Sequence, residues 1–334
     1  MDWLHVDTNI WSELLRRASR PDRRDFVQLA RDRGLRLGWT VDLLREVGRT
    51  RDGQSRREIA ETIVELSGDE GLILPNHFNF ARELCDALGR DHPDLVHGPL
   101  EREERYCLKH YRSLLWGLAG GSAVVQPSTE EQAVIVQDSS MHARLRGGSY
   151  NPRPYRTLIG QPSSEVLRYM RASLAGTLPA VGAFPTQRSP PIHISAMDFE
   201  VRVKLELLRA IVEVIDTAPP EDDARNFVTR RLAPTCTAEV FANWVWTKLR
   251  PEDVPAFRIA VAVSLGQTLH AFRPSNLADR DHSEVLGQAR LFLTADRKLA
   301  EVLGHRKLRQ WIPQRWRHVS LGTKGFRDLI GALA

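Results

Sequence analysis

The chain has 334 residues, of which 42% are hydrophobic and 27% charged, and its formal net charge at pH 7 is +5. This composition predicts a soluble globular protein with one large domain or two modest ones. It argues against a membrane protein or a secreted one, because no apolar run approaches the roughly 20 residues that cross a bilayer and the first residues lack a signal-peptide pattern, so we expect a cytoplasmic protein.

The first 70 residues alternate between apolar segments and segments with helical periodicity. A strand, a helix and a second strand in this order predict parallel pairing of the two strands. Thr40 or Asp42 is expected to begin the next helix, which carries Glu46. The predicted elements are strands at residues 4–10 and 35–40 and helices at residues 11–17, 25–33 and 54–66.

The middle of the chain is less regular than its two ends. A helix is predicted at residues 78–88, but residues 117–191 are rich in Gly, Pro, Ser and Gln, which is typical of an insertion. We therefore predict an α/β core formed by residues 1–70 and 225–334, with a helical and loop-rich insertion at residues 71–224. The remaining predictions are helices at residues 197–215 and 237–269 and strands at residues 291–294 and 316–321.

Acidic residues follow the predicted strands at both ends of the chain. Asp7 comes at the first strand and Asp296 directly after the strand at 291–294, while Asp279 and Asp281 stand near the start of a helical run. In a parallel α/β sheet, the carboxyl ends of the strands are where functional sites form. Carboxylates that converge there, with Glu46, would present the hard oxygen ligands that Mg²⁺ or Mn²⁺ prefers.

Three segments together resemble the PIN-domain ribonucleases: VDTNIW, the Glu in TVDLLREV, and SNLADRDHSEVLGQARLFLTADRKL. The resemblance implies a three-layer fold with a central, mainly parallel sheet flanked by helices. It also implies a four-carboxylate site for one or two Mg²⁺ or Mn²⁺ ions. The four acids implied are Asp7, Glu46, Asp279 and Asp296, with Asp281 as a substitute for Asp279, and the supporting residues are Thr8, Asn9, Thr294 and His282.

Each of these residues also has a simpler interpretation. Asp7 and Asp296 could cap the helices that follow them, because Asp is a favoured N-cap residue. Glu46 could be a solvated residue of an amphipathic helix. His282 is more often a packing residue than a functional one in this setting.

Basic residues predict contacts with a nucleic acid. From Arg297 to Lys324 there are eight Lys or Arg residues against one acid, and Trp311 and Trp316 lie among them, which suits single-stranded nucleic acid. A solvated basic surface explains this segment equally well. The residues expected to hold the nucleic acid are Arg297, Lys298, Arg153, Arg156 and Tyr155.

The resemblance and the acids together predict a metal-dependent endoribonuclease that hydrolyses RNA. The family analogy adds a role as a toxin of a toxin–antitoxin pair or as a defence nuclease, with a cognate antitoxin as partner. The apolar helices around residues 201–215 and 240–246 are most simply core, but an exposed part of them could serve as the interface of a homo-oligomer. Two alternatives stay open. One is an inactive PIN-like scaffold that binds RNA or a protein, and the other is a structure-specific DNA nuclease.

Overall fold

The structure is a computed structural model that describes residues 2–121, 158–174, 195–216, 224–267, 280, 282–322 and 324–333. The chain divides into two compact units. The first contains the described residues of Met1–Pro75, Arg102–Val136 and Ala262–Ala334, and the second those of Asn76–Glu101 and Gln137–Val261. The first unit thus joins both ends of the chain.

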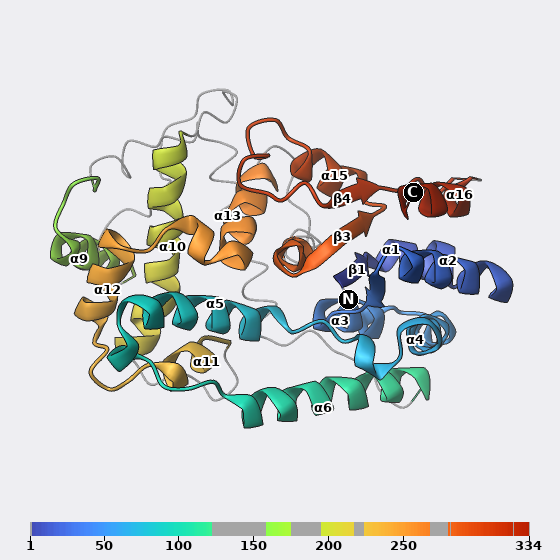
Figure 1. The fold of residues 1–334 in the computed structure, drawn as a ribbon, viewed down its shortest axis with the longest axis horizontal. Helices are drawn as coiled ribbons and strands as arrows, with labels where there is room; N and C mark the ends of the chain where they lie inside the picture. Colours follow the sequence, from blue (N-terminus) through green and yellow to red (C-terminus); the bar gives the residue numbers. More distant parts are fainter. Residues whose placement is uncertain are drawn as a thin grey trace. The chain divides into compact units, whose positions relative to one another are not determined.

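Helices are more extensive than strands in both units (Figure 1). The strands, all in the first unit, are β1 (Asp2–Val6), β2 (Leu35–Gly38), β3 (Ala289–Thr294) and β4 (Trp316–His318). The helices of the first unit are α1 (Thr8–Ile10), η1 (Trp11–Leu15), α2 (Arg20–Asp32), α3 (Val41–Arg49), α4 (Gly53–Ser67), η2 (Asp69–Gly71), α6 (Glu101–Ala119, from Arg102 on), η5 (Val285–Gly287), α15 (Arg297–Leu303) and α16 (Gly325–Leu333). Those of the second unit are α5 (Asn76–Asp91), η3 (Pro93–Leu95), α9 (Ser163–Leu174), α10 (Ala196–Asp216), α11 (Ala224–Arg231), α12 (Ala238–Thr247) and η4 (Pro251–Asp253), while α13 (Pro255–Gln267) crosses the boundary.

The four strands form one parallel sheet in the order β2-β1-β3-β4. The central strand β1 therefore lies between a strand that follows it closely in sequence and one that is nearly 300 residues away. Its register pairs His5 with Gly38 of β2 and Val6 with Leu293 of β3. Because all strands run in the same direction, their carboxyl ends meet at one edge of the sheet, as the sequence predicted for an α/β fold.

Both faces of β1 are buried. Leu4 and Val6 point into a large apolar cluster that also contains side chains of η1, α2, α3, α4, α6 and α16. Trp3 and His5 alternate with them and so point to the opposite face. There, Trp3 packs on a small cluster with Ile73. A strand covered on both faces is mostly apolar, so Leu4 and Val6 marked β1 in the sequence, although His5 interrupts the apolar run.

Side-chain caps set where several helices of the first unit begin. Asp7 accepts a hydrogen bond from the backbone N–H of Ile10, so the first strand ends at Val6 and a helix begins at Thr8. The predicted strand at residues 4–10 was therefore too long. Thr40 caps α3 by accepting from the N–H of Leu43, which agrees with the predicted start of the helix that carries Glu46.

Other predicted boundaries also need correction. The helix predicted at residues 25–33 begins five residues earlier, because Ser19 caps it. The run predicted at residues 237–269 is two helices, α12 and α13, interrupted by η4 where Pro251 cannot continue a helix. The last strand, predicted at residues 316–321, ends at His318. Helix α6 was not predicted at all.

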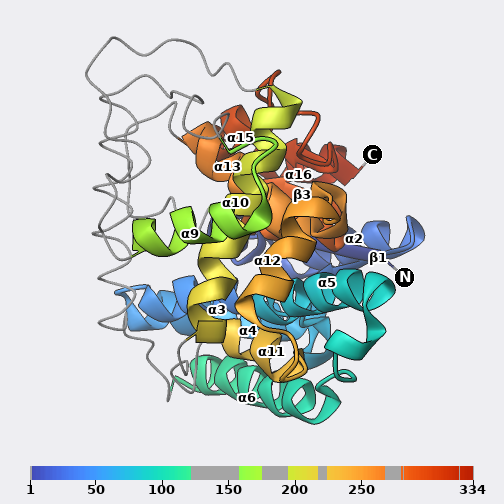
Figure 2. The same cartoon turned by 90° about the vertical axis from the view of Figure 1, so that its left-hand side faces the viewer.

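The described elements of the second unit are helices, together with an isolated β-bridge between Val96 and Leu232. Helices α9, α10 and α12 pack on one another (Figure 2), and α5 packs on α11 through the rings of Phe78 and Phe227, whose centroids are 4.1 Å apart. Arg171 of α9 forms ion pairs with Asp216 and Glu239, at 2.9 Å each. This unit contains residues 225–261, which the sequence analysis assigned to the core, and the first contains residues 102–121, assigned to the insertion. The division into a core of residues 1–70 and 225–334 and an insertion of residues 71–224 stays a prediction.

Gly38 offers a test of the packing behind the sheet. A Cβ at this position would lie 2.7 Å from Cγ1 of Ile73 and 2.9 Å from Cε3 of Trp3. We expect Gly38→Ala to lower the free energy of unfolding by about 1–3 kcal/mol, because the added methyl overpacks a filled space. Urea unfolding followed by circular dichroism measures this change.

Gly331 of α16 is the matched control, because a Cβ there would meet nothing within 4 Å. Gly331→Ala should leave stability unchanged or raise it by up to about 1 kcal/mol, since Ala is the better helix former. Equal stability of Gly38→Ala and the wild type would contradict the packing described here.

Candidate active site

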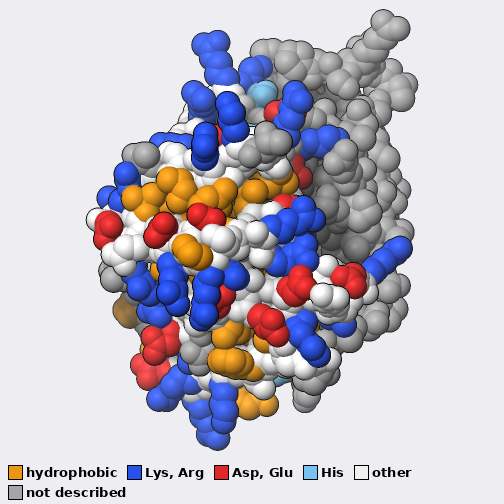
Figure 3. Space-filling view, turned by 90° about the vertical axis from the view of Figure 1, so that its right-hand side faces the viewer, with side chains coloured by type: hydrophobic (Ala, Val, Ile, Leu, Met, Phe, Trp, Pro, Cys, Tyr) orange, Lys and Arg blue, Asp and Glu red, His pale blue; other side chains and the backbone are white. Residues whose placement is uncertain are grey.

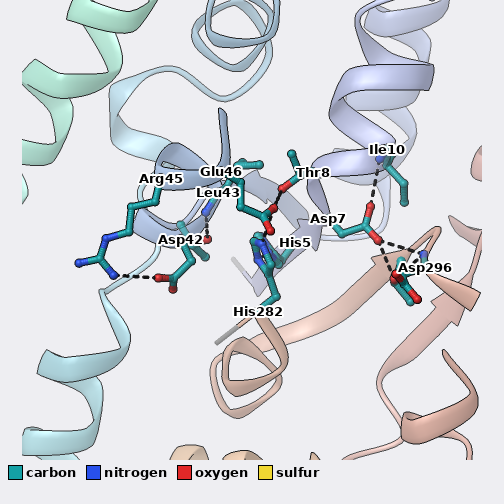
Figure 4. A network of polar contacts seen from close by, with 12 residues as sticks. His5, Asp7, Thr8, Ile10, Asp42, Leu43, Arg45, Glu46, His282 and Asp296 are labelled. Atoms are coloured by element: carbon teal, nitrogen blue, oxygen red, sulfur yellow. Dashed lines mark hydrogen bonds and ion pairs between the residues drawn. The ribbon is translucent and has the colours of Figure 1, made fainter. Parts of the chain in front are cut away.

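Asp7 lies at the carboxyl end of β1 and binds segments from both ends of the chain. Its Oδ1 accepts a hydrogen bond from the N–H of Ile10 at 3.0 Å. Its Oδ2 accepts from the Thr294 hydroxyl at 2.6 Å and from the N–H of Ala295 at 2.7 Å, with the N–H of Asp296 at 3.4 Å. These bonds hold the ends of β1 and β3 together, and Asp7 points toward Asp296 (Figure 4).

Asp296 begins the helix after β3. Its Oδ1 accepts from the N–H groups of Lys298 and Leu299, at 2.7 and 2.9 Å, and so caps α15. Its own N–H donates to the Thr294 hydroxyl at 3.0 Å. Its Oδ2 makes no hydrogen bond with any residue that the structure describes.

The charge of Asp7 has no cationic side chain in contact with it among the described residues. The Asp7 side chain is buried, at 5% exposure. Burial raises the pKa of Asp7 above its ordinary value, although the hydrogen bonds from Thr294, Ile10 and Ala295 and the charge of His282 oppose this shift. A cation in contact with this buried carboxylate would stabilise its anion further.

Glu46 of α3 and His282 form an ion pair at the same edge. Nε2 of His282 lies 3.0 Å from Oε2 of Glu46, and the Thr8 hydroxyl donates to the same oxygen (Figure 4). Burial alone would raise the pKa of Glu46, but the charge and hydrogen bond of His282 lower it. Burial alone would lower the pKa of His282, but the charge and hydrogen bond of Glu46 raise it to about 9.

His5 is the site residue that the sequence analysis missed. It is fully buried on β1, and its Nε2 lies 3.4 Å from Nδ1 of His282. Burial, together with the charge of His282, lowers the pKa of His5 to about 3. The available signal was a polar residue inside an apolar central strand, two positions before Asp7, on the face opposite Leu4 and Val6.

The residues predicted to support the acids differ in what they contact. The hydroxyls of Thr8 and Thr294 donate to Glu46 and Asp7, respectively. Asn9 is exposed, and its backbone carbonyl accepts from Ser12 at 3.2 Å. Asp279 and Asp281, the two candidates for the third acid, lie outside the described residues.

The described residues alone do not complete a metal site. No group of three or more His, Cys, Asp or Glu side chains that could hold an ion occurs among them. Carboxylate oxygens are nevertheless the right donor type for Mg²⁺ or Mn²⁺, and the anion of Asp7 has no ion-pair partner in this part of the chain. Asp7, Glu46 and Asp296 are all described and do not form such a group by themselves, so an ion site here would need Asp279 or Asp281 as well.

The predicted nucleic-acid contacts are only partly described. Arg297 is exposed and pairs with Glu301 at 3.0 Å, and Lys298 is half-buried. Trp311 is buried, at 6% exposure, so its predicted availability for base stacking was wrong; its ring belongs to the core instead. Arg153, Arg156 and Tyr155 lie outside the described residues.

Exposed arginines occur in the segment that follows Asp296, namely Arg306, Arg309, Arg315 and Arg317. On the face drawn in Figure 3, Lys and Arg side chains lie both above and below a band of hydrophobic side chains.

Comparison with known proteins found no matching family model, no similar curated protein and no similar solved structure. Within the described residues, no helix is long and apolar enough to pass through a membrane.

The Glu46–His282 pair should make stability depend on pH. The pKa of His282 is raised from 6.5 to about 9, so its stabilising effect is complete below pH 6.5 and is lost as the pH rises through about 9. In Glu46→Gln the largest effect that raises the pKa of His282 is removed and only the charges of Asp42 and Asp7 oppose burial, so we expect a smaller loss of stability over this interval. Urea unfolding in EDTA across the interval measures both proteins.

His110, which is exposed on α6, provides the control. His110→Ala should lose stability over the same pH interval as the wild type does. If Glu46→Gln also lost as much as the wild type, the ion pair would not be the source of the pH dependence.

Proposed function

We propose that the acidic edge of the sheet is the active site of a metal-dependent endoribonuclease with a PIN-like core. One observation carries the proposal: Asp7 and Asp296, which are 289 positions apart, lie together at the ends of adjacent parallel strands through the hydrogen bonds to Oδ2 of Asp7. Glu46 lies at the same edge, after β2. Sites form at this edge in parallel α/β sheets.

Asp7, Glu46 and Asp296, with Asp279 or Asp281, would hold one or two Mg²⁺ or Mn²⁺ ions. Such an ion would supply Lewis-acid chemistry for the hydrolysis of a phosphodiester. The protein's own contribution is to orient the oxygens. Thr294 and the N–H of Ala295 fix Asp7, while the cap of α15 fixes Asp296.

The substrate proposed is RNA, and the charge of the chain supports a polyanion. Arg297 and Lys298 follow Asp296 directly and would neutralise phosphates beside the acids. A role as a toxin or a defence nuclease, with a cognate antitoxin as partner, is proposed by family analogy alone.

The inactive scaffold is the second candidate, and a specific observation favours it. His282 already balances the charge of Glu46 at 3.0 Å, so this acid does not require a cation to remain ionised. Asp7 makes no ion pair with a described residue, and the charge of His282 opposes but does not cancel the effect of burial on the pKa of Asp7; this difference favours the nuclease.

Asp296→Asn tests the proposal with little risk to folding. Asn and Asp are equally good N-caps, so the bonds from Lys298 and Leu299 should survive while one carboxylate charge is lost. Because losing an outer partner of a metal ligand typically costs 10–100-fold, losing the ligand itself should lower the cleavage rate by at least about a hundredfold. Cleavage of a quenched fluorescent single-stranded RNA in Mn²⁺ measures this rate, with flap DNA assayed beside it.

Asp52 provides a matched control, because it caps α4 through the N–H of Ser55 and is exposed. Asp52→Asn should cleave RNA as fast as the wild type. Mn²⁺ should also raise the melting temperature of the wild type relative to EDTA, and raise that of Asp296→Asn less. Unchanged cleavage by Asp296→Asn would refute the site, and no effect of Mn²⁺ on the wild type would favour the scaffold.

Asp7→Asn is a weaker test of the proposal than Asp296→Asn. Both oxygens of Asp7 accept hydrogen bonds. In Asn one of these oxygens is replaced by an NH₂ group, which would face an N–H or hydroxyl group that is itself a donor. The resulting unpaired buried donor costs about 1–3 kcal/mol. A loss of activity in that variant could then come from a disturbed β1–β3 contact.

A further inference from the structure

His5 and His282 form a buried pair behind Glu46. The ring of His5 stacks on that of Phe292, with centroids 5.5 Å apart and planes at 12°, and on that of His282, with centroids 5.6 Å apart and planes at 25°. His5 is 0% exposed and His282 is 3% exposed. The position of the His282 ring is thus defined by packing against a residue of β1.

The nitrogens of His282 connect two different residues. Nδ1 faces Nε2 of His5 at 3.4 Å, and Nε2 faces Oε2 of Glu46 at 3.0 Å (Figure 4). Because the two ring nitrogens point in different directions, contacts at both of them fix the ring plane as well as its position. An imidazole with a proton on each nitrogen can donate to both partners at once.

Only one oxygen of Glu46 takes part in these contacts. Thr8 and His282 both bind Oε2, whereas Oε1 makes no hydrogen bond with any described residue. A Glu side chain on a helix otherwise has several accessible rotamers, and the two contacts select one of them. Oε1 is therefore left available for a further ligand in a defined direction.

We propose that His282 and His5 are positioning residues: His282 fixes the direction of the Glu46 carboxylate, and His5 fixes His282. The role in metal binding rests on the proposed nuclease function, whereas the contact itself does not. Metal ligands are commonly held by outer partners of this kind, and replacing such a partner typically costs 10–100-fold in metal affinity.

The first experiment reads the contact without metal. Protein labelled with ¹⁵N-histidine is examined by NMR in EDTA, comparing the wild type, Glu46→Gln and His5→Phe. We expect the ring nitrogen resonances of His282 to shift in both variants, because each removes one of its two polar contacts. Unchanged resonances in both would overturn the positioning role.

The second experiment measures Mn²⁺ affinity by isothermal titration calorimetry. His282→Ala should bind Mn²⁺ about 10–100-fold more weakly than the wild type. His282→Gln should recover most of the affinity, because its amide N–H can replace Nε2 as a donor to Glu46. His110→Ala, on an exposed face of α6, should bind as the wild type does.

The two experiments separate the failure of each proposal. If the wild type binds Mn²⁺ and His282→Ala binds it equally well, the positioning role is wrong although the metal site stands. If the wild type does not bind Mn²⁺, the nuclease proposal fails, and the NMR comparison alone decides whether His5 and His282 hold Glu46. Circular dichroism of each variant shows that it is folded.

Discussion

The candidate site depends on the buried carboxylate of Asp7. One oxygen begins the first helix of the chain, and the other holds the loop after β3 through Thr294 and Ala295. Burying a carboxylate without such donors is costly, so the contacts that satisfy it are strongly preferred over other arrangements. Since the donors come from both ends of the sequence, the same group that shapes the site also fixes the central pair of strands.

Helix capping and metal binding are compatible roles for these acids. An ionised carboxylate has about four lone-pair positions on its two oxygens. Asp296 uses Oδ1 to cap α15, and its Oδ2 makes no hydrogen bond in the described part of the chain. A cap holds the side chain in one rotamer, so it pre-orients the second oxygen. The capping interpretation of the sequence is therefore realised in the structure without excluding the functional one.

The sequence predicted those features that depend on local patterns. Buried parallel strands read as apolar runs, and Thr40 is a typical cap, so the position of Glu46 on α3 followed from short segments. The pairing of His5 with His282 spans 277 positions and has no local signature. Trp311 was misjudged for a related reason, because the basic residues around it suggest exposure while its ring is buried.

The nuclease and the scaffold differ in how the negative charge of each acid would be compensated. Glu46 has His282, whose charge and hydrogen bond favour the ionised form of Glu46, and a scaffold could keep this pair without any metal. The burial of Glu46 is thus no argument for catalysis. Asp7 differs, because burial raises its pKa and no Lys or Arg of the described residues pairs with it. In a scaffold the burial of Asp7 would be offset by neutral donors and by the charge of His282, which makes no ion pair with it, whereas a cation held with Asp296 would offset it by direct contact. Asp7 and Asp296, more than Glu46, therefore carry the case for a metal site.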